Sequence, residues 1–88
     1  MNLETIQQLE RIQHMEQLLD FVIKARKEQH INQEKSARIQ EAIRILADYY
    51  GSKEWKQDFA DDEAGLLPKD LKRGVLSEDG IWNILDSQ

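Results

Sequence analysis

Glycine and proline are absent from the first fifty residues of this chain, and this absence constrains the fold more than any other feature. All four glycines and the single proline, Pro68, lie in residues 51–88. Because glycine and proline interrupt regular elements, the break at Gly51 predicts long helices first and short elements afterwards. Neither part could bury its apolar residues alone, so we expect one helical domain over residues 1–88, with a short-helix lid following a helical hairpin at residues 1–50.

Two apolar stripes with helical spacing run through residues 1–50. In the first stripe, apolar side chains recur every three or four residues between Ile12 and Val22. In the second stripe, the same spacing holds from Ile39 to Tyr50. One unbroken helix would leave both stripes without a local partner, so we favour an antiparallel helical hairpin over that alternative.

Capping residues indicate where the helices begin and end. Asn32 can accept a hydrogen bond at the start of the second long helix, and Gly51 can close that helix in the left-handed conformation. Ser52 can cap a short third helix, and Ser77 can cap a final one. A brief helix is also expected at residues 69–73, with the proline in its first turn. The sequence therefore predicts an all-α fold in which two or three short helices cap a long antiparallel helical hairpin.

Aromatic residues concentrate where the short helices are expected to cross the hairpin, since five of the six lie between residues 49 and 82. We expect most of them in the core, because each can bury roughly 150–250 Å². The alternative is that one or two stay exposed as anchors for a partner, and Trp82 is the candidate. The residues expected in the core are Leu19, Val22, Ile39, Ile43, Leu46, Tyr50, Trp55, Phe59, Leu76, Ile81 and Leu85.

Several apolar residues lie off the two stripes, and a core built on two helices can hardly hide all of them. They are Leu3, Ile6, Leu9, Phe21, Ile23, Ile31 and Ile45. An intermolecular helix bundle would cover them, so we expect a non-enzymatic helical module that binds a protein partner or its own copy, as a dimer or a higher oligomer. The candidate contact residues are Leu3, Ile6, Leu9, Phe21 and Trp82.

Acidic residues cluster in the expected third helix. Asp58, Asp61 and Asp62 stand at spacings that place them on one helix face, where carboxylates can bind a hard cation such as Mg²⁺ or Ca²⁺. The cluster lacks the alternating ligands and central glycine of an EF-hand, so we favour a solvated acidic face or ion pairs with the basic stretch at residues 69–73. The alternative to an interaction module is a small metal- or carboxylate-dependent enzyme centred on the cluster from Asp58 to Glu63.

Charge and composition narrow the remaining possibilities. With 12 basic and 17 acidic residues the formal net charge is −5, which argues against nucleic-acid binding. The chain has no cysteine, and its two histidines lack metal-ligand spacing, so we expect no cofactor and no bound metal. No run approaches the roughly 18 apolar residues of a membrane span, and the first residues lack the basic-then-apolar order of a secretory signal. We therefore expect a cytoplasmic protein that does not enter a membrane.

The segment from Tyr49 to Leu85 resembles a family of short bacterial proteins defined only as a domain of unknown function. The shared pattern is a tyrosine pair, then Gly-Ser, Glu-Trp, an Asp-Phe pair, Asp-Glu-Ala-Gly, Leu-Pro and finally Asp-Leu-Lys-Arg-Gly-Val-Leu-Ser-Glu-Asp. The matching residues are Tyr49, Tyr50, Gly51, Ser52, Glu54, Trp55, Asp58, Phe59, Asp62, Glu63, Ala64, Gly65, Leu67, Pro68 and residues 70–79. The family has no established activity, so this resemblance implies no functional residue.

Overall fold

The computed structural model describes residues 3–28, 30–77 and 79–86, and within these ranges the chain forms four α-helices, one 3₁₀ turn and no strand. The expected all-α class is confirmed. In chain order the elements are α1 (Leu3–Arg26), α2 (Gln33–Tyr50), α3 (Lys53–Glu63), the 3₁₀ turn η1 (Gly74–Leu76) and α4 (Gly80–Asp86). None of the described helices is both long enough and apolar enough to cross a bilayer.

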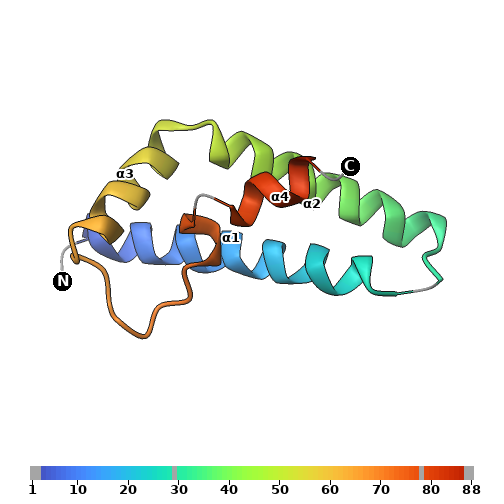
Figure 1. Ribbon diagram of the computed structural model, residues 1–88, viewed down its shortest axis with the longest axis horizontal. Coiled ribbons are helices and arrows are strands. Elements are labelled where there is room, and N and C mark those ends of the chain that lie inside the picture. Colours follow the sequence, from blue (N-terminus) through green and yellow to red (C-terminus); the bar gives the residue numbers. More distant parts are fainter. Residues whose placement is uncertain (1–2, 29, 78, 87–88) are drawn as a thin grey trace.

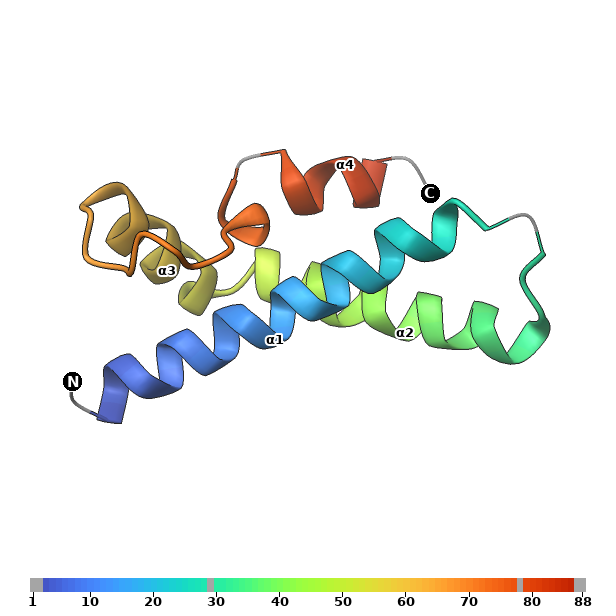
Figure 2. The ribbon, with the colours of Figure 1, turned by 90° about the horizontal axis from the view of Figure 1, so that it is seen from below.

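The two long helices lie side by side and run in opposite directions, as both ribbon views show (Figures 1 and 2). The molecule is elongated, with extents of 42 × 22 × 22 Å. Helix α3 lies at the end where α1 begins and contacts α2, while η1 packs on α1 and α4 packs on α2. The segment between α3 and η1 loops back along α1 without forming a helix (Figure 2).

Side-chain caps define the starts of α2 and α3 as expected. The Asn32 side-chain oxygen accepts the Lys35 backbone N–H at 2.7 Å, and the Ser52 hydroxyl oxygen accepts the Trp55 N–H at 3.2 Å. The expectation that Gly51 is left-handed is wrong, because its φ is −88°. Ser52 turns the chain there by bonding back to the Tyr49 carbonyl through both its N–H and its hydroxyl, so no left-handed residue is required.

The left-handed residue of the described chain is instead Gly65, with φ of 73°. Its N–H bonds to the Asp62 carbonyl at 3.0 Å, and the next N–H, from Leu66, bonds to the Asp61 carbonyl at 2.9 Å. This pair of bonds is the Schellman arrangement that satisfies the last carbonyls of a helix. Helix α3 therefore ends near Gly65, where the sequence expected it to stop.

The helix expected at residues 69–73 does not form. The Pro68 carbonyl accepts the Leu71 N–H at 3.2 Å and the Arg73 guanidinium at 2.5 Å, so it closes one tight turn instead of making the i to i+4 bond to Lys72 that would begin an α-helix. The Arg73 guanidinium also donates to the Leu71 carbonyl at 3.2 Å. The segment then continues without regular structure to η1.

The core combines buried apolar residues of α1, α2, η1 and α4, together with Leu67. Of the residues expected there, the structure buries Leu19, Val22, Ile39, Ile43, Leu46, Leu76 and Ile81. Tyr50, Trp55, Phe59 and Leu85 are only partly buried; Tyr50, Trp55 and Leu85 pack against the edge of the core, and Phe59 stacks on Trp55. The core also includes residues without a periodic signal in the sequence, among them Leu67 and the fully buried Val75.

Ser77 bonds to the first residue of α4, but α4 begins at Gly80 rather than directly after Ser77 as expected. The Ser77 hydroxyl donates to the Gly74 carbonyl at 2.8 Å and accepts the Gly80 N–H at 2.9 Å. At position 80 a Cβ atom would lie only 2.0 Å from the Gly74 carbonyl oxygen, so the close approach of these two turns requires glycine there.

Candidate functional site

Asp58 of α3 is completely buried and is held by side chains of both long helices. Arg11 of α1 donates from Nε to Oδ2 at 3.0 Å and from Nη2 to Oδ1 at 2.6 Å. Gln8 Nε2 donates to Oδ1 at 3.0 Å, and the Tyr49 hydroxyl donates to Oδ2 at 2.6 Å. A carboxylate that accepts this many bonds links α1, α2 and α3 at one point.

The surroundings of Asp58 alter the pKa values of two of its partners. Burial raises the pKa of Tyr49 far above that of an ordinary tyrosine, and donation of its hydroxyl to Asp58 raises it further. The hydrogen bond to Asp58 also raises the pKa of Arg11. Tyr49 therefore stays protonated and Arg11 charged throughout the neutral range.

Of the two expectations for the acidic residues of α3, a solvated face or ion pairs, the structure shows ion pairs at Asp58 and Asp62. Asp58 is buried because Arg11 neutralises it, and Asp61 accepts Nε2 of Gln8 and of Gln57, each at 2.8 Å. Asp62 pairs with Arg73, which confirms the expected ion pair with the basic stretch at that one position. The carboxylates thus point to separate partners, and among the described residues no three acidic, histidine or cysteine side chains could hold a metal ion.

A second buried carboxylate, Glu16 of α1, was not recognised in the sequence. Its Oε1 accepts the Val75 backbone N–H at 3.0 Å, and Trp55 Nε1 donates to the Val75 carbonyl at 2.8 Å. Both polar backbone groups of this buried turn residue are therefore satisfied by side chains from α1 and α3. Trp55 also contacts the Tyr50 ring edge-on at 4.8 Å and stacks on Phe59 at 5.1 Å, measured between ring centroids.

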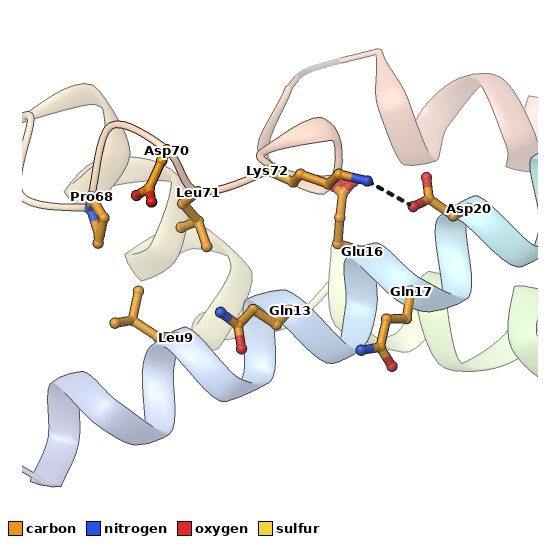
Figure 3. A pocket seen from close by; sticks show the side chains of 9 residues that line it. All are labelled: Leu9, Gln13, Glu16, Gln17, Asp20, Pro68, Asp70, Leu71 and Lys72. Carbon is orange, nitrogen blue, oxygen red and sulfur yellow. Dashed lines mark ion pairs between the residues drawn. The ribbon is translucent and has the colours of Figure 1, made fainter.

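Next to Glu16, an open groove of about 410 Å³ lies between α1 and the segment that leads into η1. We call it the α1 groove. In Figure 3, Leu9, Pro68 and Leu71 gather at one end of it together with Asp70, and Lys72 reaches Asp20 at the other. The residues that line it are Leu9, Gln13, Glu16, Gln17, Asp20, Pro68, Asp70, Leu71 and Lys72.

The five candidate contact residues do not form one surface. Leu3 and Ile6 are exposed at the start of α1, by 68% and 41%, and Trp82 is exposed by 48% on α4. Leu9 is half-buried and lines the α1 groove. Phe21, like Leu9, is half-buried and packs against the core, but it lines a different, mostly polar pocket beside the start of α2.

A search of protein families matches residues 12–88 to a domain of unknown function (DUF4298). The chain belongs to that family. The matched region begins directly after Arg11, so it includes Glu16, Tyr49 and Asp58 but not Leu9. No curated protein and no solved structure matches the chain. The geometry of the α1 groove is therefore the main guide to function.

Proposed function

We propose that this member of the DUF4298 family is a small non-enzymatic module that binds another polypeptide in the α1 groove. The observation that carries the proposal is a half-buried apolar wall, formed by Leu9, Pro68 and Leu71, that faces the open groove beside polar side chains. Its volume of about 410 Å³ falls in the range of sites that enclose a ligand group. In this proposal the two long helices act as a rigid hairpin, and residues 51–88 act as a lid that completes the groove.

Two exposed apolar residues, Ile6 and Leu3, lie before the groove at the start of α1. Each is about 60° further round the helix than the last, so Leu3 points about 120° away from Leu9. A small ligand in the groove would leave both uncovered, whereas a protein partner or a second copy of the chain is large enough to contact more than one helix face. These residues therefore support a polypeptide over a small ligand as the occupant.

The contacts of the α3 carboxylates favour binding over catalysis. Asp58 is inaccessible to a substrate and already accepts bonds from Arg11, Gln8 and Tyr49. Asp62 pairs with Arg73 rather than facing a cleft. A general acid or base must reach a reacting group in an accessible pocket. We therefore assign these carboxylates a structural role and do not propose the enzyme alternative.

Site-specific photo-crosslinking in the native cell tests this proposal. A photoreactive amino acid replaces either Gln13, at the exposed rim of the α1 groove, or Gln40, exposed on α2, which contributes no residue to the groove. We expect a discrete crosslinked product from position 13 and none from position 40. A product of twice the 10.4 kDa chain would identify a second copy, and another mass would identify a different partner. No product, or equal products from both positions, would refute the proposal.

A further inference from the structure

The α1 groove carries a negative charge. Among the described residues that line it, Glu16, Asp20 and Asp70 are carboxylates and Lys72 is the only cation, so its formal charge is −2. Asp70 is exposed and has no hydrogen bond or ion pair within the described chain. A groove of this charge attracts a basic ligand and repels an acidic one.

The cation already in the groove is held weakly. Lys72 Nζ lies 3.6 Å from Asp20 Oδ2, and the two side chains are 77% and 41% exposed. An exposed ion pair of this kind contributes little to stability. A cation from a partner can therefore replace Lys72 beside Asp20 at small cost, and Lys72 can turn to solvent.

The apolar end of the groove, where Asp70 also lies, is separated along α1 from the carboxylates of Glu16 and Asp20 (Figure 3). Leu9 and Glu16 are seven residues apart, which is about 10 Å along the helix axis, and Asp20 lies about 6 Å further on. On a partner, this distance of about 10–16 Å corresponds to three to five residues of extended chain or seven to eleven residues of helix. Both spacings fit within a dodecapeptide.

We infer, on the basis of the proposed function, that the occupant of the α1 groove is a basic amphipathic segment of a protein partner. One apolar side chain of the segment lies against Leu9, Pro68 and Leu71. A lysine or arginine of the segment lies beside Asp20 and Glu16. The groove therefore selects partners by charge as well as by shape.

A random dodecapeptide display library, selected against the full chain, tests the inference without assuming a partner. The affinity of the best peptide is then measured by fluorescence anisotropy for variants with unchanged circular dichroism. The groove variant is Asp20→Asn with Asp70→Asn. Its matched control is Glu41→Gln with Asp48→Asn, which removes two exposed carboxylates on α2. A third variant, Gln13→Trp, blocks the groove, and Gln40→Trp is its control.

We expect the selected peptides to combine apolar residues with an excess of lysine or arginine. The groove variant should weaken binding at least tenfold and the control less than twofold, and added salt should weaken binding to the wild type. If the selected peptides have no excess of basic residues but Gln13→Trp still abolishes their binding, this inference is overturned and the proposed function stays intact. If Gln13→Trp does not change peptide affinity, or if the library yields no binding peptide, both the inference and the proposed function are overturned.

Discussion

Replacement of Arg11 by methionine tests whether the buried Asp58 depends on its ion pair. Methionine fills much of the arginine volume but removes both guanidinium bonds, at 3.0 and 2.6 Å, and the only cation in contact with this carboxylate within the described chain. Removing one partner of a buried ion pair costs about 3–5 kcal/mol, because the other charge is left without compensation. Since the Arg11 side chain is 30% exposed, we expect a loss of about 3 kcal/mol.

Urea unfolding at pH 7, followed by circular dichroism and tryptophan fluorescence, measures this loss as a lower midpoint. The matched control is Arg44→Met, because Arg44 also makes ion pairs with two helical carboxylates but is exposed. We expect no measurable change in its midpoint. The comparison separates the effect of burial from the effect of losing an arginine.

A double variant separates the charge of Asp58 from the packing of the Arg11 side chain. Adding Asp58→Asn to Arg11→Met removes the uncompensated charge while keeping an acceptor for Tyr49. We therefore expect the double variant to be more stable than Arg11→Met alone. A loss below about 1 kcal/mol in Arg11→Met, or no recovery in the double variant, would refute the assignment of Asp58 as a charged anchor.

Four further substitutions have expected outcomes in the same unfolding assay. Gly74→Ala should lower the free energy of unfolding by about 1–3 kcal/mol, because the new Cβ would lie 3.0 Å from the carboxylate of the buried Glu16. Its control is Gly51→Ala, whose Cβ would meet no atom closer than 3.7 Å, so this variant should be neutral or stabilising. Trp55→Phe should cost about 1–3 kcal/mol by leaving a buried carbonyl of η1 without its donor, even though ring packing is retained. Stability should fall as the pH rises above about 10. In this range Tyr49 loses its proton in the unfolded chain but keeps it in the folded protein, where its pKa is raised, so a higher pH favours the unfolded state. Tyr49→Phe should reduce this slope, and an unchanged slope would contradict the assignment.

The sequence was a reliable guide where the determining contacts are local. Helical spacing, and caps such as Asn32 and Ser52, depend on residues within a few positions, so they could be predicted. Gly51 was assigned the wrong conformation because glycine permits a left-handed turn without requiring one. The actual turn is made by the hydrogen bonds of Ser52 to Tyr49, a choice that composition alone does not specify.

Contacts between distant residues account for the rest of the differences. Asp58 could not be recognised as buried because its partner Arg11 lies 47 residues earlier in the chain. In the segment at residues 69–73, which forms no helix, Arg73 pairs with Asp62 of α3 and also bonds to the Pro68 and Leu71 carbonyls. The α1 groove likewise joins Leu9 to residues about sixty positions later, and only the position of Leu9 off the main apolar stripe hinted at it.

Methyl NMR during titration with the best library peptide tests the central proposal most directly. We expect the methyl signals of Leu9 and Leu71 to shift in proportion to binding, because these residues form the apolar end of the α1 groove. Ile23 and Ile84 line a different groove, between α1 and α4, and their signals should stay in place. Shifts at Ile23 and Ile84 without shifts at Leu9 and Leu71 would show that the partner binds elsewhere and would contradict the proposed docking site.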